Sequence, residues 1–229
     1  MTSEQQVEAA LKSYEDVDSW KTIIFLYNAA LKEVGTKLEI LNDEFQHVHQ
    51  YNPIEHIKTR IKTPESIVKK LRRYGHETSI ENMVRYVNDI AGIRISCSFT
   101  SDIYLIADMI SKQNDLTILA RRDYMKNPKK SGYRSYHMLV TTPVFLSDSI
   151  IDTKVEIQIR TVAQDFWATL EHKMHYKFEG DGPDYITKEL RECARYVAEL
   201  DTRMEELNNE IQKYGKLSDR ALEKLFLIE

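Results

Sequence analysis

The chain has 229 residues, of which 42% are hydrophobic and 30% charged, a balance typical of one folded domain with helical extensions and unlike that of a disordered chain. Its 32 basic and 36 acidic residues give a net charge of −4, which disfavours a protein that binds nucleic acid through bulk charge. Two cysteines exclude a disulfide scaffold, the polar first 20 residues predict no secretory signal, and no apolar run approaches the roughly 20 residues of a membrane span, so we expect a cytoplasmic protein without a membrane partner.

Residues 1–52 are expected to form an N-terminal helical extension. Apolar residues at a spacing of three or four predict helices over 4–13, 17–33 and 36–50. We expect Gly35 to separate the last two, and Asn52-Pro53 to end the extension.

A mixed domain is predicted over residues 53–178, followed by a C-terminal helical region over 179–229. Capping residues and apolar spacing predict further helices over 64–73, 79–87, 101–113, 161–177, 184–214 and 218–227. The expected caps are Thr63, Thr78, Ser101 or Asp102, and Thr161. Alternating patterns predict strands over 93–99, 116–121, 135–145 and 154–160, and residues 54–62 fit a strand or a connector. Because several strands follow one another without crossover helices, we predict an α+β fold, a mixed β-sheet of about five strands surrounded by helices.

Basic residues gather in two short segments. Residues 58–73 contain seven basic residues and one acid, and residues 121–134 contain six basic residues and Asp123. Both fit an anion-binding site, although a solvated helix face and a basic loop would look the same.

Two carboxylates are candidates for chemistry. In the strand over 154–160, Glu156, Gln158 and Arg160 share one face. If this strand neighbours the one over 93–99, Asp89 and Glu156 can converge at one end of the sheet. Such a pair would hold Mg²⁺ through oxygen ligands, whereas the simpler interpretation is two unrelated surface acids.

Side-chain cations would have to bind any nucleotide phosphate, because the chain has no P-loop pattern and no G-x-G-x-x-G. Ser66 and Lys70 lie on one face of the predicted helix, and Arg60 and Lys62 point the same way in extended chain. All four groups could converge near a helix N-terminus, which favours anions.

The segment 129–137 combines basic and aromatic residues. Gly132 permits a tight turn, Tyr133 could stack on a base, and His137 could donate to a phosphate or ribose oxygen. A half-buried strand tyrosine and an ordinary polar histidine would look the same.

Six motifs together resemble the synthetase domain of the RelA/SpoT superfamily over about residues 54–177. They are, in family order, Arg60-x-Lys62-x-x-x-Ser66-x-x-x-Lys70, Asp89-Ile-Ala-Gly-Ile-Arg94, Arg122-Asp-Tyr124, Gly132-Tyr-Arg-Ser-Tyr-His137, Glu156-Ile-Gln-Ile-Arg160 and Glu171-His172-x-x-x-Tyr176-Lys177. The flanking segments resemble the small alarmone synthetases of the RelP type more than those of the RelQ type.

The resemblance implies a nucleotidyltransferase-like fold and a GTP pyrophosphokinase of the stringent response. Such an enzyme transfers the β,γ-pyrophosphate of ATP to the 3′-hydroxyl of GDP or GTP, giving ppGpp or pppGpp and AMP. By resemblance, the residues have these roles: Arg60 and Arg94 bind adenine; Lys62, Ser66 and Lys70 bind ATP phosphates; Asp89 and Glu156 hold Mg²⁺; Glu156 activates the 3′-hydroxyl; Tyr133 stacks on guanine; and Lys129, Ser131 and His137 bind the acceptor's phosphates and ribose.

The resemblance has further implications beyond the site. Many relatives have Asn where this chain has Ser131. The bifunctional relatives carry a His-Asp dyad, and no His-Asp dipeptide occurs here, so we expect synthesis without hydrolysis. Small alarmone synthetases are typically homotetramers, and the apolar seam from Leu190 to Tyr214 would form a subunit interface, unless it packs on its own domain.

Two other functions fit the residues. One is a nucleotidyltransferase that releases inorganic pyrophosphate instead of AMP. The other is an RNA-binding module that uses the two basic segments with Tyr124 and Tyr133, and this second function requires no carboxylate pair.

Overall fold

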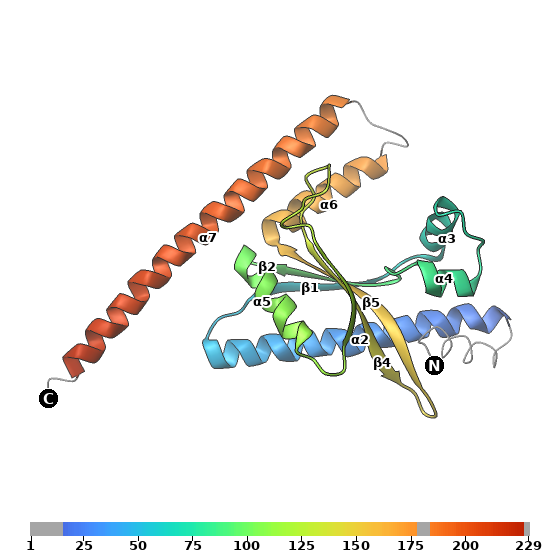
Figure 1. Ribbon diagram of the computed structural model, residues 1–229, viewed down its shortest axis with the longest axis horizontal. Helices are drawn as coiled ribbons and strands as arrows, with labels where there is room; N and C mark the ends of the chain where they lie inside the picture. The colour runs from blue at the N-terminus through green and yellow to red at the C-terminus, as the bar shows by residue number, and fades with distance from the viewer. Residues whose placement is uncertain (1–15, 178–183, 227–229) are drawn as a thin grey trace.

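The computed structural model describes the backbone of residues 16–177 and 184–226 and the side chains of residues 20–174 and 185–214. The described elements are, in chain order, α2 (Asp16–His49), β1 (Ile54–Ile61), α3 (Pro64–Arg73), α4 (Ile80–Tyr86), β2 (Ala91–Cys97), α5 (Thr100–Ser111), β3 (Thr117–Asp123), β4 (Tyr136–Phe145), β5 (Ile150–Thr161), α6 (Val162–Lys177) and α7 (Asp184–Phe226). Figure 1 shows the sheet with α2 beneath it and α7 along the other side. None of the helices in the described ranges combines the length and apolarity that a bilayer crossing requires.

The five strands form one mixed sheet in the order β1-β2-β5-β4-β3. Only the central pair, β2 and β5, runs parallel among these strands, and the other neighbours are antiparallel. The predicted α+β class with about five strands is therefore confirmed, and residues 54–61 are a strand.

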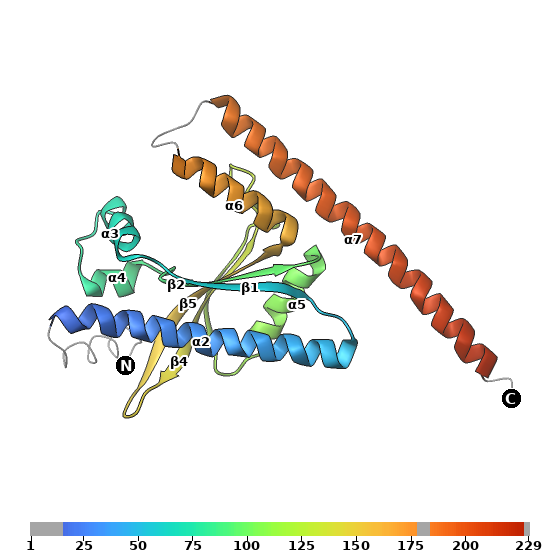
Figure 2. The ribbon, with the colours of Figure 1, turned by 180° about the vertical axis from the view of Figure 1, so that it is seen from behind.

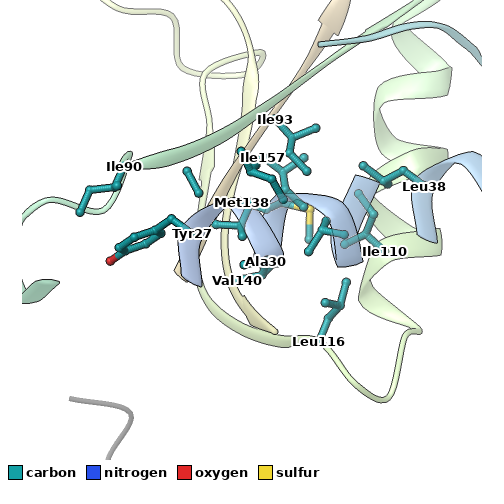
Figure 3. Packing of buried hydrophobic residues seen from close by; sticks show 14 of the residues in the cluster. Tyr27, Ala30, Leu38, Ile90, Ile93, Ile110, Leu116, Met138, Val140 and Ile157 are labelled. Atoms are coloured by element: carbon teal, nitrogen blue, oxygen red, sulfur yellow. The ribbon is translucent and has the colours of Figure 1, made fainter. Parts of the chain in front are cut away.

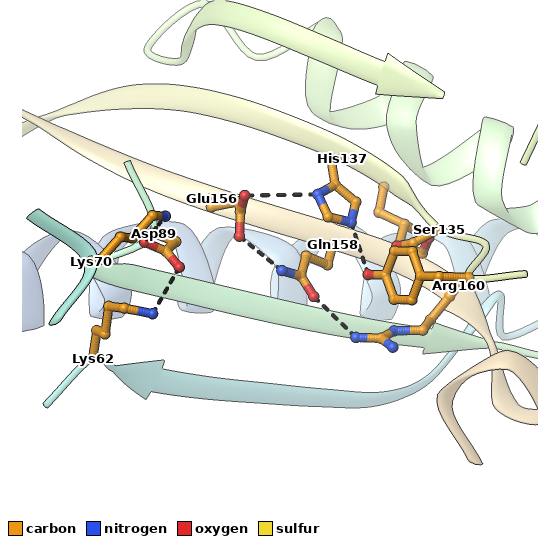
Figure 4. A network of polar contacts seen from close by, with 10 residues as sticks. Lys62, Lys70, Asp89, Ser135, His137, Glu156, Gln158 and Arg160 are labelled. Carbon is orange, nitrogen blue, oxygen red and sulfur yellow. Dashed lines mark hydrogen bonds and ion pairs between the residues drawn. The ribbon is translucent and has the colours of Figure 1, made fainter. Parts of the chain in front are cut away.

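The sheet has one apolar and one polar face, because side chains alternate along each strand. Ile93, Ile157 and Met138 are essentially fully buried on the apolar face. Figure 3 shows how they pack against Leu38 of α2 and Ile110 of α5. The opposite face carries the charged residues of the same strands, and the candidate site lies on it (Figure 4).

Helix α2 continues through Gly35, so the predicted break is wrong. Ala30, Val34 and Leu38 are all buried and form one stripe that crosses this glycine. A glycine within a helix costs about 1 kcal/mol relative to alanine, whereas burial of one large aliphatic side chain contributes about 1.5–3 kcal/mol. The apolar stripe therefore outweighs the local preference.

Three helix starts show how side chains satisfy the first N–H groups. Thr63 caps α3, as predicted, and accepts a hydrogen bond from the N–H of Ser66. The cap of α4 is Ser79 and not Thr78. Helix α5 begins at Thr100, and Asp102 is not its cap but lies in the first turn and accepts from the N–H of Phe99 at 3.0 Å.

Helix α7 is continuous to Phe226, so the predicted division after residue 214 is wrong. Its first half lies along α6, and its second half extends away from the sheet in both ribbon views (Figures 1 and 2). The helix predicted over 4–13 lies outside the described residues.

Candidate active site

The register of the central strands brings the two predicted carboxylates to one end of the polar face. Gly92 of β2 pairs with Glu156 of β5, and Asp89 lies three residues before Gly92. Figure 4 shows Asp89 and Glu156 side by side on this face. The charge of Asp89 acts to raise the pKa of Glu156, which agrees with their closeness.

Asp89 forms ion pairs with two lysines. Its two oxygens accept hydrogen bonds from Lys62 at 3.0 Å and from Lys70 at 2.7 Å, and all three side chains are less than 20% exposed. Burial alone would raise the pKa of Asp89, but the hydrogen bonds from Lys70 and Lys62 outweigh it and hold that pKa below its ordinary value. Two cations, one from the residue directly after β1 and one from α3, are thus drawn together around one carboxylate.

Glu156 is held by Gln158 and His137. The side chain of Gln158 donates to it at 2.8 Å, and Nδ1 of His137 lies 3.7 Å from its other oxygen. Burial would raise the pKa of Glu156, yet the contacts with His137 and Gln158 keep it below the ordinary value. The hydroxyl of Tyr133 lies 2.9 Å from Nε2 of His137, so these contacts continue to the acceptor-side tyrosine.

The two carboxylates are chemically suited to Mg²⁺, which prefers oxygen ligands and usually takes one or two carboxylates together with substrate phosphates. Both are ionised at neutral pH, because the pKa of each is lowered. Within the described ranges, no group of three or more His, Cys, Asp or Glu residues could enclose a metal ion. The protein alone therefore offers an open pair that substrate oxygens would have to complete.

A pocket of about 190 Å³ lies beside this pair, over β1 and β2. Its lining includes Arg60, Arg94, Gly92 and Gln158. A Cβ built on Gly92 would lie 3.4 Å from Nε of Arg60, in van der Waals contact, so this arginine lies directly over the glycine. The structure thus places the two predicted adenine-binding arginines on one pocket.

Ser66 lies at the start of α3, where its hydroxyl accepts a hydrogen bond from Thr63 at 3.0 Å. It is one turn of helix before Lys70, on the same face, as the spacing predicts. Ser66 and Lys62 therefore lie at the N-terminus of α3, whereas Lys70 is in its last turn and meets Lys62 only through Asp89. The hydroxyl of Ser66 is bonded to the capping residue Thr63.

The loop between β3 and β4 carries the predicted acceptor residues. The ammonium of Lys129 lies 4.6 Å from the centre of the Tyr133 ring and 4.9 Å from that of Tyr124, within the range of a cation–π contact. The hydroxyl of Ser131 accepts from the N–H of Tyr133 at 3.4 Å, so in this structure it supports the loop backbone.

Asp165 is a residue of this site that the sequence analysis missed. Its carboxylate lies 3.3 Å from Arg94 and 3.5 Å from Arg160, while Arg160 in turn donates to Gln158 at 3.0 Å. Nε of Arg160 and Oδ1 of Asp165 are close enough for an ion pair but are not aligned for a hydrogen bond. The sequence does contain a signal for this contact. Asp165 lies in the first turn of the helix that follows Arg160, close enough along the chain to pair with it.

Comparisons with known proteins agree with this geometry. A family model described as "Region found in RelA / SpoT proteins" matches residues 59–181. GTP pyrophosphokinase YwaC of Bacillus subtilis is 44% identical over 195 residues, covering 85% of this chain and 93% of the relative.

Solved structures give the same result. The small alarmone synthetase 2 from Bacillus subtilis matches with a TM-score of 0.76 and 43% identity, covering 83% of this chain and 98% of that one. The small alarmone synthetase 1 from the same organism, bound to its product pppGpp, matches with a TM-score of 0.79 and 34% identity, covering 85% and 99%. The similarity to these proteins covers more of the chain than the matched family region.

Proposed function

The chain belongs to the RelA/SpoT family, and from this membership we propose that it is a small alarmone synthetase, a GTP pyrophosphokinase. It transfers pyrophosphate from ATP to the 3′-hydroxyl of GDP or GTP, releases AMP, and serves stringent response signalling. We also propose that it synthesises without hydrolysing, because the chain has no His-Asp pair. The RelP type and a cytoplasmic location stay predictions.

The observation that carries the proposal is the meeting of Asp89 and Glu156 beside Lys62 and Lys70. Phosphoryl-type transfer needs positioning and charge neutralisation more than covalent help. Paired carboxylates next to paired ammonium groups supply both, at the end of a sheet where two substrates can approach from different sides.

On the acceptor side, Glu156 is proposed to take the proton of the 3′-hydroxyl as that oxygen attacks the β-phosphorus of ATP. Gln158 and His137 hold the two carboxylate oxygens, so the base is fixed before the substrate arrives. Its lowered pKa keeps it charged at neutral pH. General-base assistance of this kind typically contributes about 10²–10⁴-fold in rate.

On the donor side, Lys62 and Lys70 are proposed to neutralise the pyrophosphate that moves, with Ser66 close by at the start of α3. In the structure both lysines contact Asp89, so ATP phosphates must share or replace that contact. Mg²⁺ held by Asp89 and Glu156 would draw charge from the phosphate oxygens. Arg60 and Arg94 line the neighbouring pocket, where they would bind the adenine.

The guanine nucleotide is proposed to bind at the loop between β3 and β4. Tyr133 would stack on the base, and Lys129 and His137 would bind its phosphates and ribose. Ser131 stands where many relatives have Asn, and its contact with the acceptor is proposed only by resemblance.

We further propose a homotetramer in which α7 contributes a subunit interface. Leu200, Met204, Leu207, Ile211 and Tyr214 are each about half exposed or more, at the alternating spacing of a helix seam. The division into an extension over 1–52, a catalytic domain over 53–178 and a helical region over 179–229 stays a prediction.

Product analysis tests the function directly. The protein is incubated with ATP, GDP and Mg²⁺, and the nucleotides are separated. Formation of AMP together with ppGpp is expected. Release of inorganic pyrophosphate would instead identify a nucleotidyltransferase, and salt-dependent RNA binding that is indifferent to Asp89→Asn would identify an RNA-binding module.

The variant Glu156→Gln tests the proposed base. It keeps the shape and the hydrogen bond from Gln158, so the fold should be unchanged. The binding of both nucleotides should also be unchanged when it is measured without Mg²⁺, the ion that Glu156 is also proposed to hold. Turnover should fall by about 10²–10⁴-fold. Normal ppGpp formation by this variant would refute the assignment, whereas loss of nucleotide binding would mean that Glu156 binds substrate instead.

A further inference from the structure

We propose that helix α7 is a structural part of the acceptor site, and that Ala194 is a positioning residue that holds the Tyr133 loop at the correct distance from Glu156. The inference rests on the proposed role of Tyr133 as the guanine-stacking residue. It concerns a helix whose nearest contact with the loop is about 60 residues further along the chain.

The first observation is that the backbone of the loop at Gly132 lies directly against the methyl group of Ala194. Gly132 has a φ of 93°, and a Cβ built there would lie 2.5 Å from Cβ of Ala194 and 3.8 Å from the carbonyl oxygen of Arg191. A real Cβ essentially never lies within 3.0 Å of another atom in this way. The loop backbone can lie this close to α7 only because position 132 has no side chain and position 194 has a small one.

The second observation is that Tyr133 itself packs against the helices. Trp167 and Ala168 of α6 and Ala194 of α7 form a separate small apolar cluster, and Tyr133 and Val197 pack against it. Tyr133 is therefore supported by α6 and α7, and not by the main core.

The third observation is that α7 is fixed on both sides of this contact. One turn before Ala194, the indole of Trp167 donates to the carbonyl oxygen of Leu190 at 2.9 Å. Two turns after it, Asp201 accepts from Thr161 at 2.9 Å and from Gln164 at 2.7 Å, and all three of these side chains are buried.

These anchors connect the loop to the catalytic strand. Thr161 is the last residue of β5, the strand that carries Glu156. The loop's own hydrogen bonds, from Gly132 to Lys129 and from Lys129 to Tyr133, shape its turn, and its end reaches β5 where the hydroxyl of Ser135 donates to the carbonyl oxygen of Ile159. The contact with α7 adds a second connection to β5, through Ala194, Asp201 and Thr161. The distance from the stacking ring to the proposed base is therefore set in part by where α7 lies.

The test changes only the volume at the contact. In Ala194→Val, the added methyl groups should push Gly132 and Tyr133 outward. We expect the KM for GDP to rise about tenfold, equivalent to about 1.4 kcal/mol, with kcat at saturation and the KM for ATP unchanged. The matched control is Glu189→Val, which places the same residue on the exposed opposite side of α7.

A second pair of variants guards against misfolding. Gly132→Ala should weaken GDP binding, and Gly132→Ala combined with Ala194→Gly should recover part of it, because removal of the Ala194 methyl relieves the clash but not the cost of a positive φ. Thermal unfolding identifies any variant that has lost its fold. If Ala194→Val folds and binds GDP as the wild type does, or if the double variant recovers nothing, the inference is overturned.

Binding is also measured without turnover, by equilibrium dialysis with labelled GDP and with a non-hydrolysable ATP analogue. This separates the inference from the proposed function. If the wild type makes no ppGpp but Ala194→Val binds GDP more weakly than the wild type, the inference stands and the proposed function is refuted. If the wild type makes ppGpp and both forms bind GDP equally well, the proposed function stands and the inference is refuted.

Discussion

The proposed donor half and the proposed acceptor half of the site are built in different ways. The donor half, Arg60, Lys62, Ser66, Lys70, Asp89 and Arg94, comes from about 35 consecutive residues and is held together by ion pairs. The proposed acceptor half, Lys129, Tyr133, His137 and Glu156, is held by ring contacts, hydrogen bonds and the packing of two later helices.

The difference shows what each half has to accomplish. The donor half must tolerate several cations at close range before ATP arrives, and Asp89 compensates two of them. The acceptor half must place one hydroxyl near one base, which depends on distances set by packing. Charge changes should therefore damage the donor half most, and volume changes the acceptor half.

The largest effect outside the base itself is expected from Asp89→Asn. The amide cannot offset the charges of Lys62 and Lys70, whose side chains are only 16% and 19% exposed. We expect kcat/KM for ATP to fall about 100-fold, equivalent to about 2.7 kcal/mol, measured by steady-state kinetics. Asp115→Asn is the matched control, because it removes a half-exposed partner of Lys37. Equal activity of the two variants would contradict the role of Asp89.

The same variant has a pH signature. Because the folded pKa of Asp89 is lowered, its ion pairs stabilise the fold above the unfolded pKa and lose that effect as the pH falls through the folded pKa. The wild type should therefore lose more stability on acidification than Asp89→Asn, as measured by urea unfolding.

A smaller effect, confined to the acceptor half, is expected from Tyr133→Ala. Loss of the stacking ring should weaken GDP binding by about 1–3 kcal/mol and leave binding of the ATP analogue unchanged. Tyr133→Phe keeps the ring and removes only the hydroxyl, which contacts His137 and Ser135, so it should bind GDP nearly as well as the wild type. Tyr185→Ala, at a position 67% exposed, is the control. Equal losses for both nucleotides would mean that the ring supports the fold and not the acceptor.

Asp165→Asn should affect both halves at once, because its carboxylate lies between Arg94 on the donor side and Arg160 under Tyr133. We expect the KM values for ATP and GDP each to rise roughly fivefold, about 1 kcal/mol. Asp148→Asn, on an exposed loop, controls for the loss of a charge. A change in only one KM would show that the two halves are independent at this residue.

The same contrast explains what the sequence could predict. Lys62, Ser66 and Lys70 are related by strand and helix spacing, so their convergence follows from local geometry, and alternation in 154–160 places Glu156 on the polar face. The pairing of β2 with β5 brings Asp89 close to Glu156. The sequence predicts this closeness only on the assumption that the two strands are neighbours.

Long-range packing could not be predicted in this way. Gly132 was interpreted as a turn residue, and nothing in its neighbourhood indicates that Ala194 would lie against it. The continuity of α2 through Gly35 likewise depends on the stripe of Ala30, Val34 and Leu38 meeting the sheet. Local propensity is a weak guide wherever burial on another element decides.

The smallest effect is expected from Asp201→Asn, at the anchor of α7. Burial raises the pKa of Asp201, and the hydrogen bonds from Thr161 and Gln164 only partly oppose it. The folded state therefore binds this proton more tightly than the unfolded state, and stability due to Asp201 decreases as the pH rises from the unfolded towards the folded pKa. The amide does not titrate and still offers an acceptor oxygen. As the pH is raised from 4 to 7, the free energy of unfolding of Asp201→Asn should thus increase relative to that of the wild type, by about 1 kcal/mol or less. Urea unfolding over this range measures the difference, with Asp108→Asn, an exposed partner of Lys112, as the control. A difference that does not change with pH would show that Asp201 holds α7 through its shape alone.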